Sequence, residues 1–120
     1  MLKIYEYNNC STCKNALKFL DKKGVKYEKI AIVEQPPTVA ELKKMLGYLK
    51  ADGLTFKNLF NTSGVQYREL KVGDQIKAGL TEAAAISMLS KNGKLIKRPF
   101  LLTSDGGTVG FKEDQWKKLV

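Results

Sequence analysis

Histidine is absent from this chain of 120 residues, and cysteine occurs only twice. Two cysteines three positions apart cannot form the multi-bridge framework that stabilises small secreted domains. No run of 18 or more apolar residues is present, which argues against a membrane-spanning helix. Residues 1–7 contain neither the apolar segment nor the small-residue cleavage site of a secretory signal. We therefore expect a soluble, cytoplasmic protein.

The composition is that of a single globular domain with a basic bias. Hydrophobic residues make up 43% of the chain, enough for one core without metal ions or disulfide bonds. No repeat, low-complexity tract or linker divides the sequence, so we expect one domain over residues 1–120. The formal charge of +9 is compatible with an acidic partner. The lysines are nevertheless spread along the chain between Glu and Asp, which favours a solvated surface.

The hydrophobic period changes twice within the first third of the sequence. Residues 2–7 alternate between apolar and polar, as in a strand, and residues 25–33 form a second β-like run. Between them, apolar residues recur at helical spacing and Gly24 supplies a stop. These apolar residues are Cys13, Ala16, Leu17 and Leu20. The order strand, helix, strand predicts a βαβ unit with parallel strands.

The middle of the chain is predicted to be helical. Thr38 and Glu41 form a capping-box pattern after two prolines and ahead of apolar residues at helical spacing. Residues 52–79 carry short, mixed signals that indicate small helices and loops. Residues 81–89 are rich in alanine and predict another helix. We expect a helical insert over approximately residues 38–92.

The C-terminal part returns to strand character. Residues 100–103 and 108–111 flank a glycine-containing turn and predict a β-hairpin. Residues 113–120 then predict a closing helix. Its buried side chains should be Trp116 and Leu119, with Lys117 and Lys118 outside. Together these elements indicate an α/β fold with a small mixed sheet.

The Cys10-Ser11-Thr12-Cys13 motif lies where the first predicted strand passes into the first helix. A helix N-terminus presents unpaired N–H groups and the positive end of the helix dipole, which favour thiolate. Lys14 adds positive charge in the first turn. We therefore predict that Cys10 is a nucleophile near neutral pH. Cys13, one turn further on, can attack a mixed disulfide at Cys10 and release the partner.

Two other interpretations of the cysteine pair stay open. A zinc site needs about four ligands, and without histidine or a third cysteine only carboxylates could complete it, so we expect no metal site. Alternatively, Cys13 is only a small buried apolar residue and Cys10 acts alone. A Cys-x-x-Cys that opens the helix of a βαβ unit is a more specific redox signal than a bare pair.

A second feature is the Arg98-Pro99 pair directly before the third predicted strand. Proline has no N–H to donate, so it suits the first residue of a strand or a cis peptide bond. In thioredoxin-like folds a cis-proline loop lies beside the active cysteines. In that arrangement Arg98 could stabilise the Cys10 thiolate or bind an anionic substrate. The alternative is an exposed arginine before an ordinary proline.

Four segments occur in a characteristic order: 10–14, 34–38, 98–99 and 109–111. With them the chain resembles the glutaredoxin-coupled arsenate reductase (ArsC) and Spx family over essentially all 120 residues. The resemblance implies a thioredoxin-like, glutaredoxin-type fold of three layers, with a helical insert before the hairpin. It also implies that Cys10 is the reactive cysteine and Pro99 the cis proline of the substrate loop.

The family divides by function, and the arsenate reductases are one branch. In them the reactive cysteine is followed by Gly-Thr-Ser-Arg, and three further arginines hold the oxyanion. This sequence keeps Arg98, but the other positions are filled by Lys14, Asn61 and Lys112. Lysine lacks the bidentate fork of arginine, and asparagine also lacks its charge. The resemblance is therefore to an arsenate reductase-like branch with a Cys-x-x-Cys motif.

Spx regulators form another branch; they use Cys-x-x-Cys as a redox switch and bind RNA polymerase. Residues 98–99 and 109–114 resemble their C-terminal half, whereas 60–64 and Tyr67 resemble proteins described only as arsenate reductase-like. The leading hypothesis is a thiol–disulfide oxidoreductase that needs no cofactor except an external thiol donor such as glutathione, glutaredoxin or thioredoxin.

Three alternatives accompany this hypothesis. The first is an Spx-type redox-sensing regulator that binds RNA polymerase, and the second is an arsenate reductase that uses an external thiol donor and an oxyanion substrate. Direct binding of nucleic acid is the least favoured, because no helix combines Lys and Arg with base-reading side chains. A membrane partner is not expected.

Overall fold

The computed structural model describes residues 2–8 and 10–120 and contains one mixed sheet with strand order β2-β1-β3-β4. The strands are β1 (Leu2–Glu6), β2 (Tyr27–Ala31), β3 (Phe100–Leu102) and β4 (Gly107–Val109). β1 and β2 are parallel, whereas β3 is antiparallel to both β1 and β4. The predicted parallel pair and the predicted hairpin are both confirmed.

Helix α1 (Ser11–Lys22) connects the two parallel strands. The predicted apolar stripe faces the sheet: Cys13, Ala16 and Leu20 are buried there. Gly24 has a φ of +68°, a left-handed conformation that suits glycine where the helix ends. β2 is shorter than predicted because the chain turns after Ala31, whose carbonyl accepts a hydrogen bond from the Gln35 N–H at 2.9 Å.

The chain between β2 and β3 is helical. Its elements are α2 (Val39–Ala51), η1 (Phe56–Leu59), α3 (Val65–Glu69), α4 (Val72–Lys77), α5 (Glu82–Lys91) and η2 (Gly93–Leu95). The predicted capping box is present at α2: Thr38 Oγ1 accepts from the Glu41 N–H, and Glu41 Oε1 accepts from the Thr38 N–H, both at 3.1 Å. The short helices of α3 and α4 agree with the weak signals of that region.

Helix α6 (Glu113–Leu119) follows the hairpin. Trp116 is fully buried and donates a hydrogen bond from Nε1 to the Gly110 carbonyl at 3.1 Å. Leu119 is half-buried rather than buried, because it lies in the last turn of the chain. β4 ends earlier than predicted because Gly110 has a φ of +75°, which is incompatible with a strand.

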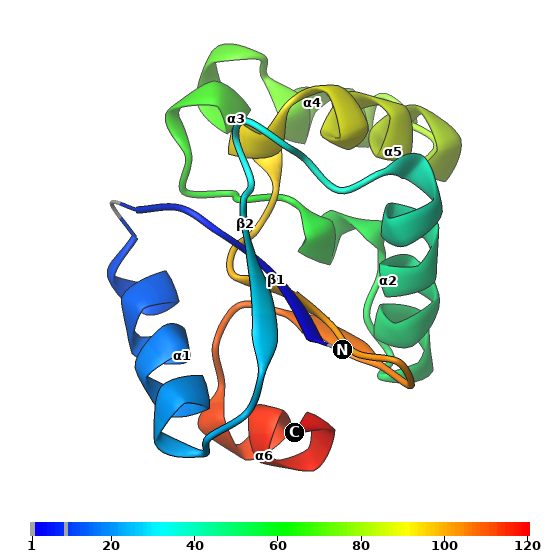
Figure 1. Cartoon of the computed structure of the whole chain (residues 1–120). Coiled ribbons are helices and arrows are strands. Elements are labelled where there is room, and N and C mark those ends of the chain that lie inside the picture. The colour runs from blue at the N-terminus through cyan, green and yellow to red at the C-terminus, as the bar shows by residue number, and fades with distance from the viewer. Residues whose placement is uncertain (1, 9) are drawn as a thin grey trace.

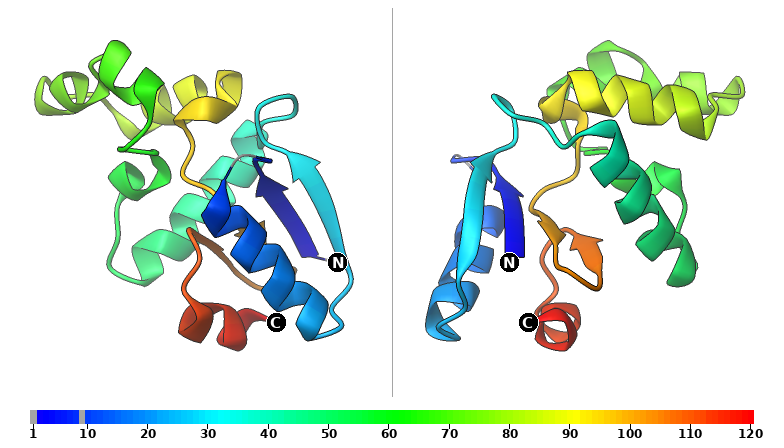
Figure 2. Two further views of the ribbon diagram at one scale, coloured as in Figure 1. Left: turned by 90° about the vertical axis from the view of Figure 1, so that its left-hand side faces the viewer. Right: turned by 45° about the vertical axis from the view of Figure 1, so that its right-hand side comes forward.

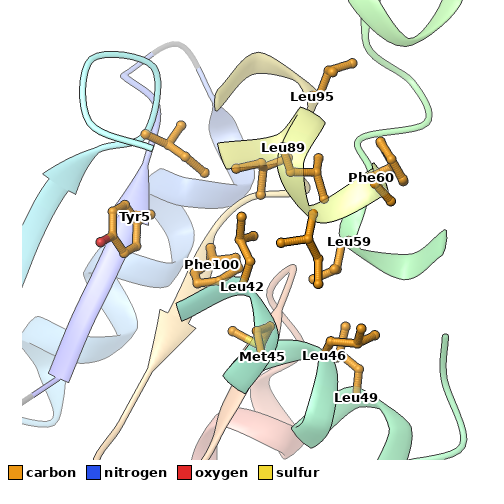
Figure 3. Close-up of a cluster of buried hydrophobic side chains, with 14 of the residues drawn as sticks. Tyr5, Leu42, Met45, Leu46, Leu49, Leu59, Phe60, Leu89, Leu95 and Phe100 are labelled. Carbon is orange, nitrogen blue, oxygen red and sulfur yellow. The ribbon is translucent and has the colours of Figure 1, made fainter. Parts of the chain in front are cut away.

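Helices cover both faces of the sheet, as the ribbon views show (Figure 1, Figure 2). On one face, Leu2, Ile4 and Leu101 pack with α1 and α6. On the other, Tyr5 and Phe100 pack against α2, α5 and the elements around them, the larger of the two cores (Figure 3). The three-layer, thioredoxin-like α/β architecture predicted from the sequence is confirmed.

None of the helices in the described part of the chain is long and apolar enough to cross a membrane. The Cys-x-x-Cys motif lies at one end of the sheet. The carboxyl end of β1 leads into the first turn of α1, where the Cys-x-x-Cys motif lies.

Candidate functional site

Cys10 is the N-cap residue of α1. Its backbone is extended, and its Sγ accepts a hydrogen bond from the Cys13 N–H at 3.2 Å. Its own N–H donates to the carbonyl of Tyr7 at 3.1 Å, which ties the cysteine to the end of β1. The Cys10 sulfur therefore occupies the place in which a side-chain oxygen normally caps a helix. The Cys13 N–H and the positive end of the helix dipole point toward this sulfur.

Cys13 is buried, with 1% of its surface exposed, whereas Cys10 is half-buried and Ser11 and Thr12 are exposed. Burial is the main reason that the pKa of Cys13 rises to about 12, and its hydrogen bond to Cys10 adds to the rise. A backbone hydrogen bond from Tyr7 acts in the opposite direction. Both cysteines are free thiols. The pair thus combines one accessible sulfur with one that is protected and protonated.

The Arg98–Pro99 peptide bond is cis, as the resemblance implied. Pro99 is buried, and its carbonyl accepts a hydrogen bond from the Gly110 N–H at 2.8 Å. The guanidinium carbon of Arg98 lies 4.4 Å from the centre of the Tyr7 ring. Arg98 is therefore connected to the cysteine loop through Tyr7. The described residues include no hydrogen bond between Arg98 and Cys10.

A cavity of about 390 Å³ opens beside Arg98. It is lined by Tyr7, Asn61, Gly64, Val65, Gln66, Glu69, Lys94 and Arg98. Asn61, which stands where the resemblance places an arginine, thus shares a cavity with Arg98. Lys14 and Lys112 are exposed and do not line it. The cavity has charges of both signs, amide groups and an aromatic wall, and can accept a ligand of mixed polarity.

A larger cavity, of about 630 Å³, runs along α1 between Phe19 and Phe111. Its lining includes neither cysteine nor Arg98, so this cavity is separate from the Cys-x-x-Cys motif. The described residues bring no group of three or more potential metal ligands together.

The sequence patterns did not indicate a role for two residues at the end of β1, Glu6 and Tyr7. The Tyr7 ring lies against the guanidinium of Arg98. An aromatic residue three positions before Cys10 is the sequence feature that could have indicated this. Glu6 is buried, with 4% of its surface exposed, and its carboxylate lies 4.0 Å from Lys29 Nζ. The spacing of the strand could have predicted this burial, because Glu6 lies two residues after Ile4 and four after Leu2, on the face that packs against α1.

A parallel βαβ unit, an antiparallel hairpin that begins at a cis proline, and a Cys-x-x-Cys at the N-terminus of α1 define a thioredoxin-like domain. Within this class, residues 5–119 match the ArsC family. The chain belongs to the ArsC family, and the resemblance drawn from the sequence is confirmed.

Relatives span nearly the whole chain. The Bacillus subtilis protein YusI is 44% identical, covering 98% of this chain and 96% of YusI. A crystal structure of an ArsC-family-related protein from Bacteroides fragilis superposes with a TM-score of 0.88 at 41% identity, over 99% of this chain and 97% of that one.

Two more distant relatives carry functional names. The global transcriptional regulator Spx of Streptococcus mutans is 25% identical over 96% of this chain and 80% of its own. The arsenate reductase of Rhizobium meliloti is 27% identical over 86% and 69%. The ArsC family therefore includes both enzymes and regulators.

Proposed function

We propose that this protein is a thiol–disulfide oxidoreductase in which Cys10 is the nucleophile and Cys13 is the resolving cysteine. The observation that carries the proposal is the position of the two sulfurs. Cys10 caps α1 and accepts the Cys13 N–H at 3.2 Å, while the Cys13 thiol is buried in the same turn. One sulfur is accessible to a substrate, and the other can reach only its partner.

The reaction proceeds in two exchanges. The Cys10 thiolate attacks one sulfur of a substrate disulfide, forms a mixed disulfide and expels the first substrate thiolate. Cys13 then loses its proton and attacks the Cys10 sulfur. This step forms the Cys10–Cys13 disulfide and expels the second substrate thiolate. The substrate gains two electrons and the protein loses two, and two equivalents of an external thiol donor restore both cysteines.

The surrounding residues support this role. Pro99, with its cis peptide bond, directly precedes β3, the strand next to β1. Arg98 lies over the ring of Tyr7, whose carbonyl accepts a hydrogen bond from the Cys10 N–H. In this proposal Arg98 and Lys14 supply positive charge at the mouth of the site. A guanidinium near a thiolate or a substrate carboxylate favours the anionic form.

The direct test is a cysteine trap. With Cys13→Ser, the mixed disulfide at Cys10 cannot be resolved, so tagged protein recovered from lysate should carry covalent partners that a reducing agent releases. The Cys10→Ser variant is the matched control and should carry none. A Cys13→Ser trap as empty as this control would contradict the proposal.

A redox-sensing regulator is the second candidate, favoured by the Spx relatives and by the net charge of +9. In that case the Cys10–Cys13 disulfide changes the affinity for a protein partner such as RNA polymerase, and no substrate is turned over. Pull-down with oxidised and reduced protein separates the two functions. Partner binding that follows the redox state, without reduction of disulfide substrates, identifies the regulator.

Reduction of an oxyanion such as arsenate is less well supported. Of the four positions at which the resemblance places arginines, only Arg98 carries a guanidinium. Asn61 lies in the cavity beside it without a charge, and Lys112 is exposed at the start of α6. A single guanidinium offers one bidentate contact to a tetrahedral anion.

A further inference from the structure

The cavity of about 630 Å³ along α1 takes no part in the reaction proposed above. Helix α6 lies beside α1 in the ribbon views (Figure 1, Figure 2). The apolar wall of the cavity consists of Phe19 from α1 and Phe111 from the segment that leads into α6, with ring centres 5.6 Å apart. Both rings pack against Trp116, at 6.3 and 5.0 Å. Trp116 is fully buried, whereas the two phenylalanines are half-buried and offer aromatic surface to a side chain from outside.

Charged side chains surround this aromatic wall. Lys18, Lys22, Asp21 and Glu113 all line the cavity. The Asp21 carboxylate already accepts a hydrogen bond from the Tyr27 hydroxyl at 2.8 Å. Among residues 2–8 and 10–120, by contrast, no ion pair engages Lys18 or Lys22. These two ammonium groups are therefore available to a partner.

The two lysines belong to a row that starts near the reactive cysteine. Lys14, Lys18 and Lys22 are four residues apart, so they follow one side of α1 at steps of about 6 Å. All three are exposed, and Asp21 is the only acidic residue of α1. This lysine row begins one turn beyond Cys10, the N-cap of α1, and ends at the cavity. A positively charged strip thus joins the Cys-x-x-Cys motif to the aromatic cavity.

The separation of Cys10 and Phe19 determines the size of a partner that meets both. Nine residues of α-helix cover about 14 Å. An extended polypeptide covers the same distance in about four residues. Glutathione has only one residue on each side of its cysteine, and one residue covers about 3 Å. A partner that contacts the cysteine and the cavity together is therefore a protein.

The spacing of the lysine row matches that of acidic residues in an extended chain. Side chains on one side of such a chain recur every second residue, about 6.6 Å apart, which is close to the step of about 6 Å between the lysines. Nucleic acid also carries negative charge. However, Asp21 and Glu113 line the cavity and would repel a continuous chain of phosphates. A peptide can place an uncharged side chain there.

We propose that the lysine row and the aromatic cavity form a docking surface for a protein disulfide. Its reactive cysteine is followed by acidic side chains at every second position and then by an aromatic or large aliphatic side chain, the anchor. The anchor packs against Phe19 and Phe111 while the partner's cysteine faces Cys10. This inference rests on the proposed oxidoreductase function, for which it names the substrate class.

Peptides with an activated cysteine test the docking surface. In the acidic peptide, a four-residue spacer of alternating glutamate and serine separates a cysteine, held as its 2-thiopyridyl disulfide, from a phenylalanine. The reference peptide has glutamine in place of glutamate. Cys10 attacks the peptide sulfur, a mixed disulfide forms, and the sulfur–sulfur bond to the pyridine breaks with release of 2-thiopyridone. In wild type we expect the acidic peptide to react at least about fivefold faster than the reference at low ionic strength, and salt to reduce this ratio.

Two charge-reversed proteins connect the ratio to α1. Lys18→Glu combined with Lys22→Glu should lower the ratio to about one or less, because attraction becomes repulsion. Lys43→Glu combined with Lys44→Glu is the matched control: it makes the same change of charge at two exposed positions of α2, on the other side of the sheet, and should keep the wild-type ratio.

A crosslinking peptide locates the anchor in the wild-type protein and needs no variant. With benzoylphenylalanine in place of phenylalanine, illumination of the mixed disulfide should attach the peptide to residues that line the cavity, which mass spectrometry identifies. Crosslinks elsewhere would overturn the inference, and so would an equal ratio in wild type and in the Lys18 and Lys22 variant. Equal peptide rates, with a thymidine oligonucleotide bound through Lys18 and Lys22, would overturn it in favour of nucleic acid. Release of 2-thiopyridone from none of the peptides would instead overturn the proposed function.

Discussion

Burial distinguishes the two cysteines of the Cys-x-x-Cys motif. They are three residues apart, yet Cys10 is half-buried at the helix cap and Cys13 is enclosed beneath it. Enclosure raises the pKa of Cys13 to about 12, mainly because a thiolate would lose its solvation there. The structure therefore determines which of the two sulfurs is accessible from solvent.

This difference predicts selective alkylation. In the reduced native protein at pH 8, iodoacetamide should modify Cys10 and leave Cys13 as a free thiol, because alkylation requires an accessible thiolate. Peptide mass spectrometry after rapid quenching measures both sites. In denaturant the two cysteines should react alike. Comparable modification of both sites in the native protein would show that Cys13 is not protected.

Glu41 is a second residue with a defined electrostatic role. Tyr5 donates to Glu41 Oε1 at 2.6 Å and Lys3 donates to Oε2 at 3.2 Å, so the carboxylate joins α2 to β1. Burial by itself would raise the pKa of Glu41, but the hydrogen bonds from Tyr5, Thr38 and Lys3 outweigh burial and lower it. The ionised carboxylate therefore stabilises the folded state.

A lowered pKa fixes the direction of the pH dependence. The stabilisation is present above the ordinary carboxyl pKa of 4.5 and is lost as the pH falls through the lower value of the folded state. At pH 7, Glu41→Gln should reduce the free energy of unfolding by about 1 kcal/mol, and the difference from wild type should narrow below pH 4.5. Urea denaturation at several pH values measures this.

Glu82→Gln is the matched control, because the Lys50–Glu82 pair is exposed on both sides and contributes little. A Glu41→Gln effect no larger than that of the control at pH 7 would show that the contacts of Glu41 do not stabilise the fold.

Among the secondary-structure elements, the helices between β2 and β3 approach the chain at the end of β2 most closely at Gly93, the first residue of η2. A Cβ added there would lie 1.9 Å from the carbonyl oxygen of Ile32, which is backbone and cannot move aside cheaply. Only glycine allows α5 and η2 to approach the end of β2 this closely.

Gly93→Ala should therefore lower the free energy of unfolding by more than about 2 kcal/mol, as overpacking against rigid atoms does. Gly47→Ala is the opposite case: it lies in α2 with no atom within 4 Å of an added Cβ. Alanine there should be neutral or stabilising by up to about 1 kcal/mol. Thermal unfolding followed by circular dichroism compares the two, and equal effects would contradict the close approach at η2.

The sequence predicted most elements because their signals are local. The capping box at Thr38, the helix stop at Gly24 and the hairpin turn each depend on residues close together in the chain. The early end of β4 was not predictable, because it depends on the backbone that Gly110 adopts beside Pro99.

In the candidate site, too, the features that depend on local sequence were predictable and those that depend on tertiary structure were not. The motif residues Cys10 and Cys13 and the cis bond at Pro99 follow from local sequence and from the family resemblance. The contact between Arg98 and Tyr7 joins residues 91 positions apart in the sequence (98 − 7), and no local pattern indicates it. The burial of Glu6 depends on α1 packing over its face of β1, which is tertiary structure.

In the molecule as a whole, one sheet contributes to two hydrophobic cores, and the Cys-x-x-Cys motif lies at one end of that sheet. One face packs against α1 and α6, and the opposite face packs against the helices between β2 and β3 (Figure 2). The chain between β2 and β3 contributes Asn61, Val65 and Lys94 to the cavity beside Arg98. The helices between β2 and β3 thus contribute to the cavity beside Arg98, whereas the two cysteines belong to the first turn of α1.

The proposed function requires that Cys10 and Cys13 form one reversible two-electron couple. Equilibration in glutathione buffers of graded ratio, followed by acid quenching, alkylation and mass spectrometry, tests it most directly. We predict a single transition in which both thiols disappear together and an intramolecular Cys10–Cys13 disulfide appears. A protein in which Cys10 carries glutathione while Cys13 stays a free thiol at every ratio would contradict the account.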